Sequence, residues 1–178
     1  LENIAVAGCS DKFHITVNPD NTTEFNNLFV AGDASCGVML AHSASNQAER
    51  IVKSVVENKN LSDYPIKSIP AIIYITPEIA SVGLKEQDLD DETKKNIQIK
   101  KVLLGSIAKS WCDEASDGFL KLIIKDNFII GAHLVCPEAS SLIPLLEFFI
   151  DNKISIDKIK EMIFPHPSYS ELILEAVK

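Results

Sequence analysis

The run Pro165-His166-Pro167, near the carboxyl end, constrains the fold more than any other feature of the sequence. A residue that precedes a proline is pushed toward extended geometry, and each proline ring removes a backbone N–H. An imidazole between two prolines therefore cannot lie inside a helix. The sequence predicts that His166 is presented from a stiff turn.

A helix is predicted immediately after this turn. Apolar residues recur there with the spacing of a single helical stripe, at Tyr169, Leu172, Ile173, Ala176 and Val177. Ser168 and Glu171 have the spacing of a capping box that opens such a helix. Glu171 is then within one turn of His166, where a carboxylate can orient an imidazole and stabilise its protonated form, as a general base requires. The alternative is a plain helix cap beside a surface histidine.

The composition argues against nucleic acid or a membrane as a partner. The chain of 178 residues has a net charge of −8, and its 17 Lys and Arg residues form no basic patch. The longest apolar run, residues 142–150, is too short to span a bilayer and contains Glu147. No two cysteines are close enough in sequence for a zinc site or a redox disulfide, so no metal is expected and buried, reduced thiols are predicted. The cysteines are Cys9, Cys36, Cys112 and Cys136.

A second candidate site lies where the apolar run 28–33 ends in Gly32-Asp33. The run predicts a buried strand that places the Asp33 carboxylate at the edge where open α/β sheets hold ligands. A helix is predicted to begin between Met39 and His42, with its free amides facing the same space as Asp33. This corner suits a cofactor, although an ordinary strand-loop-helix unit is the alternative. The apolar side of the helix consists of Leu40, Ala44, Ala48, Ile51, Val52, Val55 and Val56.

A polar segment over residues 58–69 predicts a linker and hence a division into residues 1–66 and 67–178. Strands are predicted over residues 13–17, from Pro70 onward, and then at 97–104, 119–124 and 128–135, the last two joined as a hairpin. A helix that is apolar nearly all round is predicted over 140–150, with Pro144 in its first turn or at a kink.

The run from His166 to Glu171 resembles the His-Pro-Thr-x-Ser-Glu signature that ends the flavin-dependent pyridine nucleotide-disulfide oxidoreductases. Further runs resemble the same family in the same order, and within it the dihydrolipoamide dehydrogenases are the most similar. These runs are Thr23 to Asp33 with Met39-Leu40-Ala41-His42, Pro70 to Gly83, Gly118 to Leu122, and Gly131-Ala132-His133. The chain departs from the family at residues 43–47, where a basic residue and then acidic residues are usual.

The resemblance implies an α+β fold. Residues 67–178 would form the carboxyl-terminal dimerisation domain, an antiparallel sheet packed by helices. Residues 1–66 would be the incomplete end of the nucleotide-binding domains, with the last strand and helix of an α/β FAD-binding domain.

The resemblance also assigns roles to individual residues. His166 is the expected base that deprotonates a dithiol, Glu171 the carboxylate that holds it, and the His166-Pro167 bond a candidate for cis. Asp33 is expected to bind the ribityl chain of FAD. The start of the following helix is expected to approach the isoalloxazine through Met39, Leu40, Ala41 and His42.

The sequence contains neither a G-x-G-x-x-G phosphate-binding motif nor a C-x-x-x-x-C dithiol, so we expect it to be the carboxyl-terminal part of a longer enzyme. The resemblance implies that the full protein oxidises a dithiol, dihydrolipoamide, through FAD with NAD as acceptor, whereas this fragment alone is inactive. A homodimer is implied, with a lipoyl-bearing subunit of a 2-oxoacid dehydrogenase complex as a further partner. The expected compartment is the cytoplasm, or the mitochondrial matrix in a eukaryote.

Three other functions are compatible with parts of the sequence. A glutathione- or mycothiol-type disulfide reductase shares the histidine motif. A non-catalytic homodimerisation module fits the apolar residues 142–150, but such a module needs neither His166 nor Asp33. A hydrolase using His166 with Ser168 or Ser170 lacks the nucleophile-elbow pattern around either serine.

Overall fold

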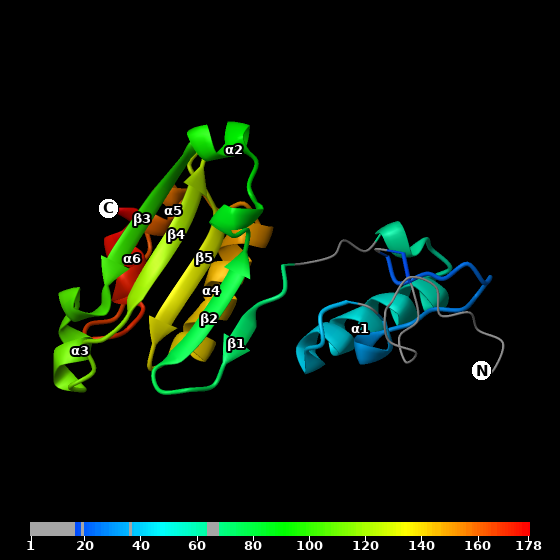
Figure 1. Cartoon of the computed structure of the whole chain (residues 1–178), viewed down its shortest axis with the longest axis horizontal. Coiled ribbons are helices and arrows are strands. Elements are labelled where there is room, and N and C mark those ends of the chain that lie inside the picture. The colour runs from blue at the N-terminus through cyan, green and yellow to red at the C-terminus, as the bar shows by residue number, and fades with distance from the viewer. Residues whose placement is uncertain (1–16, 19, 36, 64–67) are drawn as a thin grey trace. The chain divides into compact units, whose positions relative to one another are not determined.

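The computed structural model describes residues 17–18, 20–35, 37–63 and 68–178. The chain divides into two compact units, Leu1–Lys67 and Ser68–Lys178, and Figure 1 draws both. The strand predicted over residues 13–17 falls outside the described residues except for its last position. The domain assignment drawn from the sequence stays a prediction.

The second unit contains a sheet of five antiparallel strands in the order β1-β2-β5-β4-β3 (Figure 1). The strands predicted at 97–104, 119–124 and 128–135 are confirmed to within one residue at each end. The five strands are β1 (Ala71–Ile73), β2 (Glu78–Gly83), β3 (Ile97–Leu103), β4 (Phe119–Lys125) and β5 (Phe128–Cys136).

The predicted hairpin between β4 and β5 is also confirmed. Asp126 and Asn127 connect these strands, and both have positive φ angles, 51° and 69°. Two central residues with positive φ form the type of turn whose twist matches that of the flanking strands. The local sequence therefore favours the pairing of these two strands, which are neighbours in the sheet.

Helices cover one face of this sheet, and Figure 1 shows α4, α5 and α6 behind the strands. Helix α4 (Ala139–Asp151) packs on β2 and β5, while α6 (Glu171–Val177) packs on β3 and β4 and also contacts α5 (Ile156–Lys160). Pro144 lies inside α4, beyond its first turn. The shorter elements are α2 (Asp91–Lys95), α3 (Ala108–Cys112), η3 (Glu86–Asp88) and η4 (Leu104–Ser106).

The core of the second unit lies between the sheet and these helices. Alternate residues of each strand point to the same face, so Leu120 and Leu122 of β4 meet Leu134 of β5 there, and all three are at most 1% exposed. The apolar stripe predicted after His166 is confirmed, because each of its residues is at most 3% exposed. These residues are Tyr169, Leu172, Ile173, Ala176 and Val177.

The described part of the first unit contains one long helix, α1 (Ala41–Glu57), and the turns η1 (Gly32–Ala34) and η2 (Leu61–Asp63). The strand predicted over 28–33 does not form. Phe29 makes only an isolated bridge with Thr22. A strand needs neighbouring strands to pair its backbone N–H and C=O groups, and the described residues of this unit supply none.

Helix α1 begins within the predicted interval, but much of its predicted apolar stripe is exposed. Val52, Val55 and Val56 are 59%, 62% and 77% exposed, whereas the buried residues of the helix are Ser43, Arg50 and Ser54. The described residues of the first unit therefore contact the polar side of this helix and leave the carboxyl-terminal half of its apolar side uncovered.

Candidate functional site

The turn between α5 and α6 presents the His166 side chain, which is 69% exposed. Its Nδ1 atom lies 2.9 Å from Oε1 of Glu171, so the predicted contact between these side chains is present. The second carboxylate oxygen, Oε2, accepts the backbone N–H of Ser168 at 2.9 Å. Glu171 therefore binds the imidazole and the backbone of the same turn at once. The peptide bond between His166 and Pro167 is cis, as predicted.

The capping box predicted from Ser168 and Glu171 is only half formed. Helix α6 begins at Glu171, and residues 168–170 form a tight turn in which the Glu171 N–H donates to the Ser168 carbonyl at 3.4 Å. The Ser168 hydroxyl bonds the Ser170 hydroxyl at 2.7 Å instead of a helix amide. The carboxylate half of the box remains, because Glu171 accepts the Ser168 N–H.

The electrostatics of the pair fix the proton arrangement of the imidazole. The hydrogen bond from His166 holds the pKa of Glu171 below its ordinary value, although partial burial acts in the opposite direction. An ionised carboxylate can only accept, so Nδ1 carries the proton of the neutral ring and Nε2 keeps a lone pair. Nε2 is therefore the atom that can remove a proton from a substrate.

The residues predicted to hold a cofactor surround the start of α1. Asp33 is exposed in η1, and Leu40 is the residue that precedes the helix, with no side-chain hydrogen bond capping the helix start. Gly32 has a φ of 69°, and a Cβ atom at this position would lie 3.1 Å from the Cβ of Ala44. A glycine is thus needed for η1 to approach α1. Met39, Ala41 and His42 are exposed at the same end of the helix.

Two contacts were missed from the sequence. Gln47 lies in the segment that departs from the family pattern, and its Oε1 accepts the N–H of Gly32 at 2.7 Å, which ties η1 to α1. Asp113 accepts the Tyr169 hydroxyl at 2.9 Å across 56 positions of sequence. The only signal was the hydroxyl of a tyrosine within an apolar stripe, which needs a partner when the ring is buried.

The cysteine prediction holds at one described position and is wrong at another. Cys136 is buried, and burial raises the pKa of its thiol to about 11. Cys112 is exposed because α3 is a short surface helix that ends at this residue. Cys9 and Cys36 lie outside the described residues.

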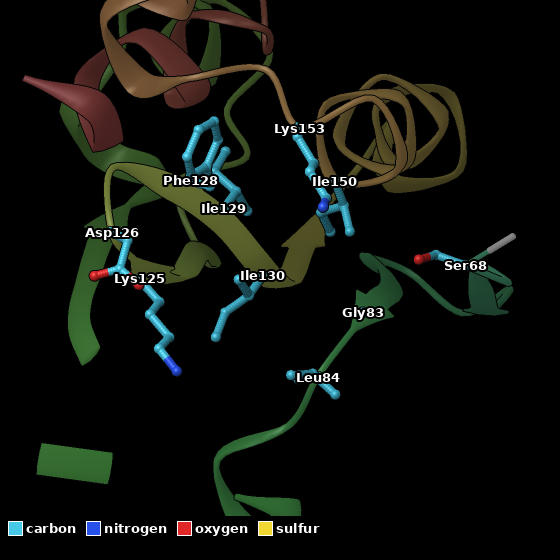
Figure 2. A pocket seen from close by; sticks show the side chains of 10 residues that line it. All are labelled: Ser68, Gly83, Leu84, Lys125, Asp126, Phe128, Ile129, Ile130, Ile150 and Lys153. Atoms are coloured by element: carbon cyan, nitrogen blue, oxygen red, sulfur yellow. The ribbon is translucent and has the colours of Figure 1, made fainter. Parts of the chain in front are cut away.

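A separate cavity of about 580 Å³ lies between the β4–β5 hairpin and the end of α4. Figure 2 shows the apolar side chains of Leu84, Ile130 and Ile150 on its walls, with Lys125 and Lys153 among the labelled residues. None of the residues predicted to bind a cofactor or to act as a base lines this cavity. His166 instead lies on an exposed turn away from this cavity.

Within the part of the chain that the structure describes, no group of three or more His, Cys, Asp or Glu side chains is arranged to hold a metal ion. Across the same residues, no helix combines the length and the apolar character needed to cross a membrane.

Comparisons with known proteins agree with the fold. The family described as "Pyridine nucleotide-disulphide oxidoreductase, dimerisation domain" matches residues 69–177. The dihydrolipoyl dehydrogenase of Geobacillus stearothermophilus is 32% identical over 180 residues, covering 100% of this chain and 37% of that protein. The dihydrolipoyl dehydrogenase of Chlamydia pneumoniae is 32% identical over 177 residues, covering 98% of this chain and 38% of that protein.

Among solved structures, LpdA from Mycobacterium tuberculosis has a TM-score of 0.81 at 26% identity, covering 92% of this chain and 36% of LpdA. This chain therefore spans little more than a third of the length of the relatives that it matches. The family match extends over more than half of the chain. The chain belongs to the pyridine nucleotide-disulphide oxidoreductase family, and residues 69–177 are its dimerisation domain.

Proposed function

We propose that this chain is the carboxyl-terminal part of a longer flavoenzyme that oxidises dihydrolipoamide with NAD as acceptor, and that His166 is its base. In this reaction the two thiols lose two electrons and two protons and become a disulfide. NAD⁺ gains two electrons and one proton, and the second proton goes to solvent. The observation that carries the proposal is the 2.9 Å hydrogen bond between His166 Nδ1 and Glu171 Oε1.

Three features of the pair support this role. Glu171 holds Nδ1, which leaves Nε2 to accept a thiol proton. The same carboxylate is fixed by the Ser168 N–H, so the ring is oriented by a group that is itself held. The imidazole is exposed in its own unit, so a substrate can reach it. A histidine with a purely structural role does not need all three features at once.

The residues at the start of α1 fit FAD. The exposed Asp33 carboxylate suits the hydroxyl groups of a ribityl chain, and the first amides of α1, which no side chain caps, suit a carbonyl oxygen. Met39, Leu40, Ala41 and His42 would present these amides. FAD, when bound, supplies a two-electron carrier between the dithiol and NAD. Gln47 and Gly32 would hold η1 in place beside the helix.

The proposal includes a homodimer, which the dimerisation domain of the family supports. Apolar residues just before the histidine turn are exposed: Met162 is 38% and Ile163 is 96% exposed. A second copy covering this surface would bring another protomer next to His166. A lipoyl-bearing subunit of a 2-oxoacid dehydrogenase complex would supply the substrate. The compartment would be reducing, either the cytoplasm or a mitochondrial matrix.

The test replaces His166 by Gln in the longer protein that contains this chain. We expect the rate of dihydrolipoamide oxidation to fall about 10²–10⁴-fold, because a general base contributes that much to such a step. NADH-dependent reduction of a dye, which needs the flavin and not the base, should be unchanged. His133→Gln is the matched control, because His133 is a half-buried strand residue outside the proposed site.

A His166→Gln variant that oxidises dihydrolipoamide at the parental rate would contradict the base assignment. A protein that reduces glutathione disulfide or mycothiol disulfide, and leaves dihydrolipoamide untouched, would keep the fold and the base but change the substrate class. If the protein binds no flavin and reduces no dye, the remaining interpretation is a non-catalytic homodimerisation module.

A further inference from the structure

Tyr169 is the only residue of the turn 168–170 whose side chain is directed into the core. It is 2% exposed and packs within the hydrophobic core of the second unit, whereas His166, three residues earlier, is largely exposed. The backbone of the turn is continuous with α6, because the Leu172 N–H donates to the Tyr169 carbonyl at 3.1 Å. The position of the Tyr169 ring thus bears on where α6 begins, and Glu171 is the first residue of that helix.

The hydroxyl of Tyr169 is held by a carboxylate from another element. It donates to Oδ2 of Asp113 at 2.9 Å, and the other oxygen, Oδ1, accepts the Lys109 ammonium at 2.9 Å. Hydrogen bonds to an ionised acceptor are shorter and stronger than those between neutral groups. Asp113 therefore has both oxygens engaged and a single orientation that serves Tyr169.

The segment that carries Asp113 is itself attached to the core. Leu104 and Ile107, just before α3, belong to the same core as Tyr169 and are 0% and 4% exposed. Ser110 of α3 is fully buried, and its hydroxyl donates to the Ile107 carbonyl at 2.8 Å. Asp113 is thus a fixed point for the Tyr169 hydroxyl and not part of a loose loop.

We propose that the Tyr169–Asp113 hydrogen bond is a positioning device for the base, which holds the turn so that Glu171 meets His166 at hydrogen-bonding distance. This inference rests on the proposed function of His166. Tyr169 and Asp113 act through Glu171 and touch no substrate. Catalytic groups lose rate steeply with small displacements, so a bond that fixes their turn affects the rate without taking part in the chemistry.

The test measures dihydrolipoamide oxidation and NADH-dependent dye reduction by the longer protein carrying Tyr169→Phe, which removes the hydroxyl and keeps the buried ring. We expect kcat for dihydrolipoamide to fall about tenfold, with dye reduction and the KM for NAD unchanged. Tyr74→Phe is the matched control, because Tyr74 is 75% exposed and lies in another part of the unit. It should leave both activities unchanged.

Variants of Asp113 provide a second test in case Tyr169→Phe impairs folding, because the Asp113 side chain is 36% exposed. Asp113→Ala should lower kcat as Tyr169→Phe does, and Asp113→Asn should restore most of the rate, because its side-chain oxygen can still accept from the Tyr169 hydroxyl. The double variant Tyr169→Phe with Asp113→Ala should be no slower than either single variant, since both remove the same bond.

Equal loss of dye reduction and dithiol oxidation would overturn the inference, because it would indicate a general structural role. So would additive losses in the double variant. Unchanged dithiol oxidation in both single variants would also overturn it, provided that His166→Gln abolishes that activity in the same assay. If His166→Gln is fully active, the proposed role of His166 itself is wrong. The result for His166→Gln therefore distinguishes failure of the proposed function from failure of the positioning inference.

Discussion

Val82 in β2 and Val55 in α1 have identical side chains, but Val82 is 3% exposed and Val55 is 62% exposed. Val82 belongs to a core whose members all come from the second unit, and that unit buries the apolar face of its sheet with its own helices. Val55 lies on an apolar helix face that the described residues of the first unit leave open. The second unit therefore covers the main apolar face of its sheet by itself, whereas the described residues of the first unit leave part of the apolar side of α1 exposed.

Hydrogen exchange of the chain 1–178 should show the largest difference between the two units. We expect amides of β4 to exchange at least about a thousand-fold more slowly than those of α1, because a buried strand opens only with the whole unit, at a cost of several kcal/mol. A helix with an uncovered apolar face has few tertiary contacts that keep its backbone hydrogen bonds from opening. Peptide-resolved mass spectrometry gives both rates in one experiment. Equal protection of β4 and α1 would contradict the comparison.

A matched pair of substitutions gives the next largest effect. Val82→Ala should lower the free energy of unfolding of the second unit by about 2 kcal/mol, since it removes two buried methyl groups and leaves a cavity. Val55→Ala should change the free energy of unfolding of the first unit by less than about 0.5 kcal/mol in the chain 1–178. Urea denaturation followed by the fluorescence of Trp111, which lies in the second unit, measures the first value, and amide hydrogen exchange of α1 measures the second. In the longer protein proposed above, Val55→Ala should become costly, and a neutral effect there would mean that the α1 face is uncovered in that protein as well.

The smallest effect concerns the acid stability of the histidine turn. The hydrogen bond from His166 lowers the pKa of Glu171 from an ordinary value of 4.5, so its ionised form stabilises the fold above that pH. This contribution is lost as the pH falls through the lowered pKa of the folded state. The stability difference between the parent and Glu171→Gln, less than about 1 kcal/mol at neutral pH, should therefore shrink as the pH falls below 4.5 and through the lowered pKa of Glu171.

Thermal unfolding of the two proteins across this range measures the difference. Glu175→Gln, which removes the carboxylate of an exposed pair with Lys178, is the control and should show little pH-dependent difference from the parent. A stability gap between the parent and Glu171→Gln that widens as the pH falls below 4.5 would mean that the carboxylate does not stabilise the turn in its ionised form.

Several features of the second unit could be predicted because their causes are local. The alternation of apolar residues marks β3, β4 and β5, and the turn residues Asp126 and Asn127 join the last two. The contact between His166 and Glu171 spans five positions, so a turn followed by a helix brings the side chains together. Its role as a catalytic pair stays a prediction.

The first unit shows where local patterns were insufficient. Residues 28–33 have the composition of a buried strand, but a strand exists only when other strands pair with it, and only Thr22 meets Phe29. The apolar stripe of α1 predicted the helix correctly, but it did not show that Val52, Val55 and Val56 are exposed. A helix forms from bonds within its own backbone, whereas burial depends on what packs against it.

By itself, the sequence determined the strands β3, β4 and β5, helix α4, the histidine turn and the buried stripe of α6, because backbone preference and side-chain periodicity act over a few residues. Only the tertiary structure decided that β5 lies between β2 and β4, that Gln47 holds Gly32, and that Asp113 receives the Tyr169 hydroxyl. These contacts join distant segments. Their free energy depends on the packing of the whole unit, which no local pattern specifies.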